Sequence, residues 1–429
     1  MRVLMILFRD IHSDARVQQE AVALAQMGWE VDIACVKTTV QPTPDLHERV
    51  RLLRFTIQTK RLKRLVDRQK DQRMKRGVYR VIRNPLVKLA KDVVAQRQFS
   101  FRVVSLCEDS SYDVIHCHDP YTLSIGGYLK RKLGARLVYD SHELFNEPNS
   151  KNRWERAIGY RAESFWINHV DHLIAGNEFM AKELEARYSD VKTTVVRSIP
   201  DSIDQLPDDE EKHYFHQSLG LEPDAKVILY HGTFVKNSGL EELIASLKYL
   251  PSIYKAVLMG DGVQRETLEV LIQENNLERR VYFHSLVPPQ EMLELIAHAH
   301  VGVALQPSQC INHRLATPNK IFEYIQAGLP VVASDQPGNS IVIGTYKAGL
   351  LVDPLDVQGI SRAIEEIVTN PLPYFIGTLR ARKEMTWEKE RNQLIELYQG
   401  IEQERQAVAV EMDKVGEELV SIKPRLREL

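Results

Sequence analysis

The chain has 429 residues and a net charge of −2, with 44% of its residues hydrophobic and 27% charged. This composition excludes disorder and fibrous repeats for most of the chain, and the length is too great for one hydrophobic core, so we expect two domains. No uncharged apolar run approaches the roughly 20 residues that a membrane-spanning helix requires. The apolar run at the N-terminus is too short for a signal peptide. The four cysteines lack metal or redox spacing, which favours a cytoplasmic protein.

Strand-like and helix-like segments alternate through the first half of the chain. Apolar runs bounded by turn residues predict strands at 2–8, 30–37, 49–56, 112–118, 136–141, 171–175 and 192–197. A predicted helix at 14–27 follows the first strand and ends before Gly28. Strands that alternate with helices indicate a parallel sheet covered on both faces. We therefore expect a doubly wound, Rossmann-like α/β domain over residues 1–200.

A strongly basic segment interrupts this alternation. Residues 49–102 contain 18 Lys or Arg and three Asp, a net charge of +15, whereas the rest of the chain has a net charge of −17. Such asymmetry indicates an anionic partner, which could be a membrane surface, a nucleic acid or a phosphorylated ligand, unless the charges merely solvate a helical surface. Nucleic acid is the least favoured partner, because the segment contains no recognisable nucleic-acid-binding module.

The insertion at 57–105 is expected to be helical. Asn84-Pro85 is a typical helix start, and apolar residues follow at helical spacing: Leu86, Leu89, Ala90, Val93 and Val94. This stripe predicts an amphipathic helix that either packs on the domain or lies at an interface. An interfacial helix with these charges would attach reversibly to an anionic membrane. A packed helix would instead leave the charges to hold a diphosphate on a soluble acceptor.

The alternation restarts after a proline-containing and acidic linker at 201–224. Strands are predicted at 226–231, 255–260, 281–285, 301–306, 330–334 and 349–352, and helices at 239–249, 263–275, 289–298, 318–327 and 356–369. We expect a second doubly wound domain over 225–375 and a helical segment over 376–429. Apolar residues recur every seven positions from Leu394 to Ile422, so self-association through a coiled coil is one possibility. Gly400, Gly416 and Pro424 weaken the helix, and we expect docking on the protein's own domains as the first alternative.

Ligands of open parallel sheets bind at the carboxyl ends of the strands, so two facing domains suit the joining of two substrates. The most informative segment begins at Thr317, a potential cap, with Pro318 at the first helical position and Gly328 at the end of the helix. Lys320 and Glu323 share a face. A helix N-terminus with a lysine suits a diphosphate, and Glu323 could accept hydrogen bonds from ribose hydroxyls. The alternative is a capped helix with a surface Lys–Glu pair.

This segment, Ala316 to Asp335, resembles the signature of the retaining GT4-type glycosyltransferases of GT-B fold, in its Thr-Pro-Asn-Lys-x-x-Glu form. Other segments similar to that family follow in the right order: 113–120, 137–145, 229–232 with 239–243, 259–262 and 349–354. The resemblance covers nearly the whole chain. It implies two Rossmann-like domains and the transfer of a sugar from a nucleotide-diphosphate sugar to a hydroxyl acceptor with retained configuration.

The resemblance also implies roles for individual residues. The catalytic candidates are His118, at a strand end beside the transferred sugar, and Glu323. We expect His116 on the opposite face of its strand from His118. The donor-binding candidates are Gly232, where the backbone would approach the phosphates, and Lys236, Thr317, Asn319, Lys320 and Glu323. The acceptor-side candidates are Asp14, Arg16, His142 and Glu143.

Two departures from the family pattern motivate alternatives. The family usually has a second glutamate eight positions before Glu323, where this chain has Leu315, and a basic residue before the donor-loop glycine, where it has Ser238. Lys236 or Lys320 could supply the missing charge. The alternatives are a catalytically silent GT-B partner subunit and a sugar-nucleotide 2-epimerase.

No Asp-x-Asp motif occurs in a plausible loop, so we expect a metal-independent enzyme without a cofactor. The expected partners are a nucleotide sugar and a lipid-linked or saccharide acceptor, as in polysaccharide biosynthesis. Together with the basic insertion, a lipid-linked acceptor favours a peripheral position on the cytoplasmic membrane face, and no nucleic acid is expected.

Overall fold

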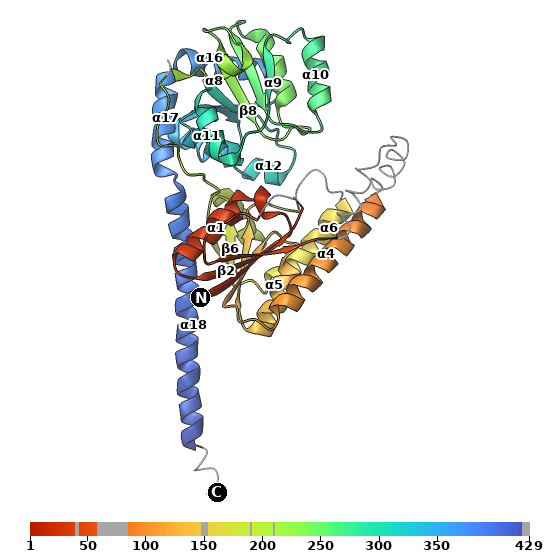
Figure 1. Ribbon diagram of the computed structural model, residues 1–429, viewed down its shortest axis with the longest axis vertical. Coiled ribbons are helices and arrows are strands. Elements are labelled where there is room, and N and C mark those ends of the chain that lie inside the picture. The colour runs from red at the N-terminus through yellow and green to blue at the C-terminus, as the bar shows by residue number, and fades with distance from the viewer. Residues whose placement is uncertain (39–42, 58–84, 147–152, 189–190, 209–210, 423–429) are drawn as a thin grey trace.

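A computed structural model describes residues 1–38, 43–57, 85–146, 153–188, 191–208 and 211–422. Two domains are stacked on one another, and each is built on one parallel sheet (Figure 1). The predicted α/β class and the two-sheet architecture are confirmed.

The N-terminal sheet has the strand order β3-β2-β1-β4-β5-β6-β7, and all its pairs are parallel. Its strands are β1 (Arg2–Leu7), β2 (Glu30–Val36), β3 (Val50–Phe55), β4 (Val114–His118), β5 (Arg136–Ser141), β6 (His172–Ala175) and β7 (Lys192–Val195). Its main helices are α1 (Ala15–Gln26), α4 (Pro85–Cys107), α5 (Leu123–Leu133), α6 (Arg153–Ile167) and α7 (Glu178–Arg187). Because helices cover both faces, the central strands are continuous apolar runs.

The C-terminal sheet has the order β10-β9-β8-β11-β12-β13. Its strands are β8 (Lys226–His231), β9 (Tyr254–Met259), β10 (Val281–His284), β11 (Val301–Ala304), β12 (Val331–Ser334) and β13 (Gly349–Val352). Its helices are α8 (Tyr214–Leu219), α9 (Leu240–Ser246), α10 (Arg265–Glu274), α11 (Pro289–Ala297), α12 (Ile311–Leu315), α13 (Asn319–Gln326), α14 (Pro337–Ser340), α15 (Ile343–Tyr346), α16 (Val357–Thr369) and α17 (Pro371–Glu384). The segment expected to be a linker contains α8, whose Phe215 is fully buried in the C-terminal core.

The order of strands reverses beside β1 in one sheet and beside β8 in the other. Such a switch point leaves a crevice at the carboxyl ends of the central strands. The loops that follow β1, β5, β8 and β11 all contribute residues to one cleft between the domains. The topology therefore positions the site that the sequence predicts.

Helix α4 buries a different face from the stripe that the sequence indicates. Its core-facing residues are Ala95, Phe99, Val103 and Cys107. Val93 and Val94, members of the expected stripe, are 42% and 46% exposed. Residues 58–84, which hold most of the basic insertion, lie outside the described residues. The described part of the stripe thus faces solvent and does not pack on the domain.

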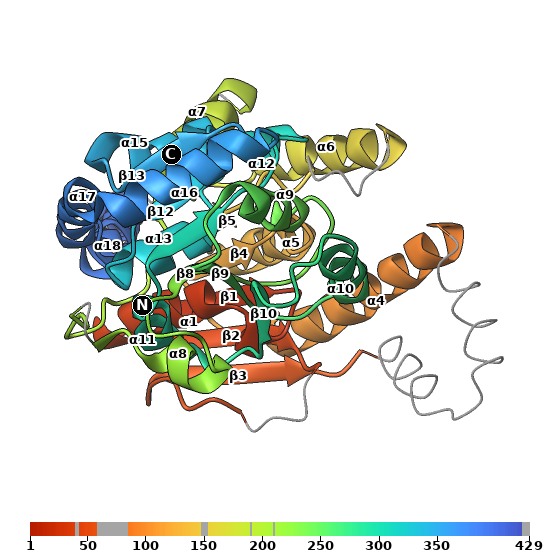
Figure 2. The ribbon, with the colours of Figure 1, turned by 90° about the horizontal axis from the view of Figure 1, so that it is seen from above.

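The last helix, α18 (Trp387–Ile422), leaves the C-terminal domain and returns to the N-terminal domain (Figure 1). Leu394, Tyr398 and Ile401 are fully buried in the same cluster as strand β1 and helix α1. Viewed from above, α17 and α18 lie on the opposite side of the molecule from the outer ends of α4 and α6 (Figure 2). The expected docking is confirmed as far as Ile401. Self-association through the rest of α18 stays a prediction.

No helix among the described residues has the length and apolar content to cross a membrane.

The docking of α18 predicts a difference between two truncations on the same helix. We expect Leu394→Ala to lower the free energy of unfolding by about 2–5 kcal/mol, because a fully buried leucine leaves a cavity. Val408, 48% exposed on this helix, is the matched control, and Val408→Ala should change stability by less than about 0.5 kcal/mol. Denaturant unfolding followed by circular dichroism measures both. Equal effects of the two substitutions would contradict the docking.

Candidate active site

A cleft of about 770 Å³ lies between the two domains. Nine of the eleven predicted site residues line it: Asp14, Arg16, His142, Glu143, Gly232, Thr317, Asn319, Lys320 and Glu323. His118 and Lys236 are not among the lining residues. The structure therefore brings the donor-side and acceptor-side candidates together, with the exception of His118 and Lys236.

Helix α13 forms the C-terminal wall of the cleft. Its apolar side, with Ile321, Phe322 and Ile325, is buried in the core of that domain, and this burial turns Lys320 and Glu323 toward the cleft. Pro318 is the N-cap, and the first hydrogen bond of the helix is donated by the N–H of Ile321. The N–H groups of Asn319 and Lys320 therefore have no acceptor within the helix. The wall thus presents free backbone donors, one cation and one carboxylate.

Thr317 does not cap α13 as expected. Its hydroxyl donates to the carbonyl of Gly338 at 2.6 Å, and no side chain caps the helix. The end of α13 follows the prediction, because Gly328 adopts a φ of +71° immediately after the helix.

Lys320 supplies the positive charge beside the donor loop. Its Nζ lies 3.8 Å from the ring centroid of Tyr230 and 3.5 Å from the position that a Cβ on Gly232 would take. Burial lowers the pKa of Lys320 to about 8, although Glu323 acts in the opposite direction. Lys236 is exposed and lies outside the cleft lining. Of the two lysines that could replace the missing basic residue, only Lys320 is in place.

Gly232 contributes to the cleft differently from what the sequence suggests. Its φ of +129° favours glycine. Its N–H, however, donates to the carbonyl of Met259 at 3.0 Å, because the parallel ladder continues one residue past β8. This N–H group is therefore not available to a phosphate.

Glu323 is held by a residue that the sequence analysis did not single out. His231, the last residue of β8, places its Nε2 3.0 Å from Oε2 of Glu323 and is nearly completely buried. The signal was present, since His231 immediately precedes Gly232 in a segment that resembles the family's donor loop. The pair fixes the carboxylate at the cleft surface.

Two asparagines join the domains beside the cleft, and both escaped the sequence analysis. Asn312 accepts a hydrogen bond from the N–H of Leu144 at 2.7 Å. Asn177 donates to the carbonyl of Leu315 at 2.7 Å and to the hydroxyl of Thr317 at 3.3 Å. The side chain of Leu315 packs against the N-terminal core, which explains an apolar residue where the family has a glutamate. No local pattern signals such contacts between distant segments.

The N-terminal wall carries the acceptor-side candidates. His142 follows β5, and its side chain is 19% exposed. Glu143 is exposed. Asp14 caps α1 by accepting from the N–H of Val17 at 3.3 Å. Arg16 donates from Nε and Nη2 to the two carboxylate oxygens of Asp140, at 2.8 and 3.0 Å.

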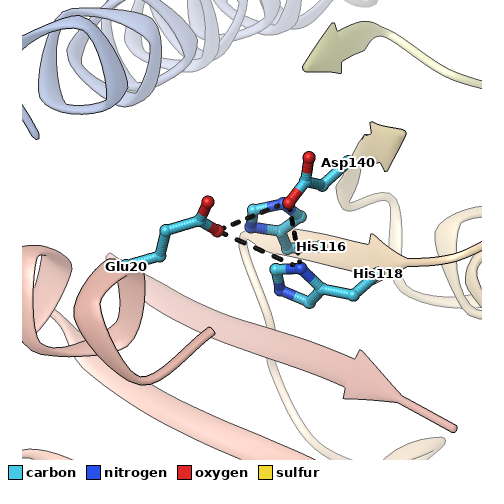
Figure 3. A group of neighbouring side chains, drawn as sticks. All are labelled: Glu20, His116, His118 and Asp140. Atoms are coloured by element: carbon cyan, nitrogen blue, oxygen red, sulfur yellow. Dashed lines mark hydrogen bonds and ion pairs between the residues drawn. The ribbon is translucent and has the colours of Figure 1, made fainter. Parts of the chain in front are cut away.

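His118 lies behind this wall in a buried cluster with Glu20, His116 and Asp140 (Figure 3). It is fully buried, and its Nδ1 lies 3.3 Å from Asp140. The expectation that His116 faces the other side of its strand was wrong. Residues two apart on a strand share a face, and the two imidazole rings stack at 4.1 Å. His142 takes the place in the cleft that we expected for His118.

Among the described residues, these four bring metal-ligating atoms within 4.8 Å of one another. The guanidinium of Arg16 also faces this cluster. Its Nε lies 2.8 Å from Asp140 and 3.0 Å from Glu20, so a guanidinium already faces both carboxylates. A divalent ion would place two more positive charges beside it in a medium of low dielectric constant. The arrangement fits an ion-pair network.

Comparisons with known proteins agree with the geometry. Residues 13–198 match the glycosyl transferase 4-like domain, and residues 211–386 match the glycosyl transferases group 1. The chain is 29% identical to an uncharacterized glycosyltransferase, YqgM, of Bacillus subtilis, over 50% of this chain and 57% of that protein. It is 26% identical to a D-inositol 3-phosphate glycosyltransferase of Corynebacterium urealyticum, over 68% of this chain and 72% of that protein.

Solved structures share the fold at lower identity. A sucrose-phosphate synthase of Thermosynechococcus elongatus superposes with a TM-score of 0.71 at 20% identity, over 96% of this chain and all of that one. HepE of Anabaena in complex with UDP superposes with a TM-score of 0.69 at 16% identity, over 93% of this chain and all of that one.

The burial of Lys320 predicts an unusual titration. We expect its ε-amine to titrate near pH 8, so that it is charged at pH 7 and loses its charge as the pH rises through 8. A lysine in water titrates near about 10.4. Carbon-13 NMR of dimethylated lysines measures this, with the signal assigned by its loss in Lys320→Arg and its retention in Lys236→Arg. Titration near the value for water would contradict the buried position.

Proposed function

Because this chain belongs to the GT4-like glycosyltransferases of GT-B fold, we propose that it moves a hexose from a nucleotide-diphosphate sugar to a hydroxyl acceptor with retained configuration. The observation that carries the proposal is the meeting of Lys320, Glu323 and the N-terminus of α13 with His142 across one cleft. HepE, a structural neighbour, is described in complex with UDP and with UDP-glucose, which supports a nucleotide-sugar donor.

The donor would bind against the C-terminal wall. Its diphosphate faces the first N–H groups of α13 and the ammonium group of Lys320, which together offer a partial and a full positive charge. Glu323, oriented by His231, accepts hydrogen bonds from the ribose hydroxyls. We also propose that the chain belongs to the subgroup of this family that carries the Thr-Pro-Asn-Lys-x-x-Glu form of the signature.

The chemical step requires stabilisation of a nucleoside diphosphate as it leaves. Lys320 and the N-terminus of α13 provide fixed charge where negative charge develops. Arg9, which lines the cleft beside Asp14, adds a cation from the opposite wall. We propose that these groups replace a metal ion, so that turnover persists in EDTA. No cofactor is required.

Screening a pooled nucleotide-sugar library by mass spectrometry, with lipid-linked and saccharide acceptors, tests the proposal. Transfer to an acceptor hydroxyl is the expected result. Release of a new free sugar without acceptor would identify an epimerase. Donor binding by calorimetry without turnover on any acceptor would identify a silent partner subunit. The family matches favour neither alternative.

Glu323→Gln should weaken donor binding by roughly 10- to 100-fold, because a hydrogen bond to a charged group contributes about 1.5–3 kcal/mol, and should reduce transfer strongly. Glu266, an exposed carboxylate on α10 of the same domain, is the matched control, and Glu266→Gln should leave the affinity unchanged. Isothermal calorimetry with the donor compares the two variants. Wild-type affinity in Glu323→Gln would remove Glu323 from the site.

We also propose that the acceptor is reached at the cytoplasmic membrane face, as enzymes of polysaccharide biosynthesis with lipid-linked acceptors require. The supporting observation is the outer face of α4, where Val93, Val94 and Phe101 are 42%, 46% and 73% exposed around the exposed cation Arg97. Apolar side chains with cations on one helical face suit the surface of an anionic bilayer.

Vesicle sedimentation measures this attachment. The protein should sediment with vesicles of phosphatidylglycerol and phosphatidylcholine at low salt, and the bound fraction should fall as salt is raised, because each cation near the surface contributes about 1 kcal/mol. Replacing Val93 and Val94 by Glu should reduce binding. Val270→Glu, at an exposed site on α10, is the control. Protein that stays in the supernatant with anionic vesicles at low salt would exclude membrane attachment.

A further inference from the structure

Asp140 is the centre of a buried network behind the cleft. Both of its oxygens accept hydrogen bonds from Arg16, at 2.8 and 3.0 Å. Its Oδ2 also lies 3.3 Å from Nδ1 of His118 and 3.5 Å from Nδ1 of His142. Asp140, His118 and Arg16 are buried, and only His142 has a substantial share of its side chain in the cleft. One carboxylate therefore links the interior to the cleft surface.

The inner side of the network is closed by Glu20 and α18. Glu20 lies 4.0 Å from both His116 and His118 (Figure 3). It also lies 3.0 Å from Arg16. Nδ1 of His116 shares a 2.9 Å hydrogen bond with the hydroxyl of Tyr398, which is fully buried on α18. The parts of the network come from α1, β4, β5 and α18, so their positions are fixed by packing on four sides.

His142 is the member of the network that a substrate in the cleft would contact. Burial alone would lower the pKa of His142, but its contact with Asp140 raises the pKa above the ordinary value. The charged and titratable groups around His142 include Asp140, Asp14, Arg16, Glu20, His116, His118 and Asp119, and Arg9 and Glu143 line the same pockets. Burial also raises the pKa of Glu20 to about 7, although Arg16 acts against it. The carboxylate of Asp140 lies 3.5 Å from the imidazole.

We propose that Asp140 is a positioning residue, which fixes the imidazole of His142 in the cleft with Nδ1 directed to its carboxylate, while Arg16 holds Asp140 in place. With Nδ1 directed to Asp140, Nε2 is the nitrogen that remains to donate a hydrogen bond to an oxygen of the bound substrate. The catalytic consequence rests on the proposed function, whereas the orientation and protonation of His142 do not.

Nitrogen-15 NMR of the histidine-labelled, wild-type protein tests the proposal without any substrate. We expect His142 to titrate above the ordinary histidine value of about 6.5 and, once neutral, to keep its proton on Nδ1, because that nitrogen lies 3.5 Å from the carboxylate of Asp140. The signal is assigned by its loss in His142→Gln. An Nε2–H tautomer, or titration below the ordinary value, would overturn the proposal whether or not the protein transfers sugars. Stoichiometric zinc that suppresses the titration would also overturn it.

Asp140→Asn should lower the pKa of His142 by about one unit or more, because an opposite charge within about 4–6 Å shifts a pKa by 1–3 units. Asp171 is the matched control, since it also pairs with basic residues, Lys130 and Arg136. It precedes strand β6 and so lies at the amino ends of the strands, whereas His142 follows the carboxyl end of β5. Asp171→Asn should leave the titration of His142 unchanged. An unchanged His142 in folded Asp140→Asn would overturn the proposal, and the wild-type tautomer remains decisive if that variant does not fold.

A double-mutant cycle separates positioning from mere stability. If Asp140 acts through His142, Asp140→Asn should lower kcat at least tenfold with little change in KM for the donor. The same substitution should cost almost nothing further in a His142→Gln background. A full additional loss in that background would show that Asp140 acts independently of His142 and would overturn its assignment as a positioning residue.

Discussion

A guanidinium and a carboxylate meet inside the N-terminal domain, almost out of contact with water, and the cleft is arranged around them. Removing such charges from water costs several kcal/mol unless each is paired and hydrogen-bonded. Arg16 satisfies this condition with its three nitrogens, two on Asp140 and one on the carbonyl of Val196 at 2.7 Å. The pair therefore links α1, β5 and the segment after β7. These are the elements from which the chain builds one wall of the cleft and then leaves for the second domain.

The two walls have different physical characters. The C-terminal wall offers donors and a cation on one short helix, and it is rigid because the opposite side of α13 is packed in a core. The N-terminal wall offers groups whose charges depend on a buried network. Asn177 and Asn312 bring the walls together with hydrogen bonds to and from backbone groups. Each bond needs the carboxamide of its asparagine and a backbone partner from the other domain, so together they help to set the spacing of the cleft.

Much of the fold was predictable because strands buried on both faces are continuous apolar runs, and their ends follow the turn residues closely. Helix α13 was predictable from one amphipathic segment and its terminal glycine. The sequence predicted most of the residues that line the cleft, but it did not predict how they contact one another. The N–H of Gly232 is occupied because the ladder extends past its strand. His118 is buried beside Glu20, which is remote in sequence, and no local pattern indicates that contact. The face of His116 was predictable from strand alternation and was nevertheless assigned wrongly.

Helix α18 gives the molecule an order of assembly. Part of the core of the N-terminal domain, including Leu394 and Tyr398, is encoded after the C-terminal domain. During synthesis from the N-terminus, that core stays incomplete until the whole C-terminal domain has been made. A fragment ending before Trp387 would expose the apolar surface that α18 covers, and His116 would lose its hydroxyl partner. The N-terminal domain thus reaches its final form only after the C-terminal domain and the first turns of α18 have left the ribosome.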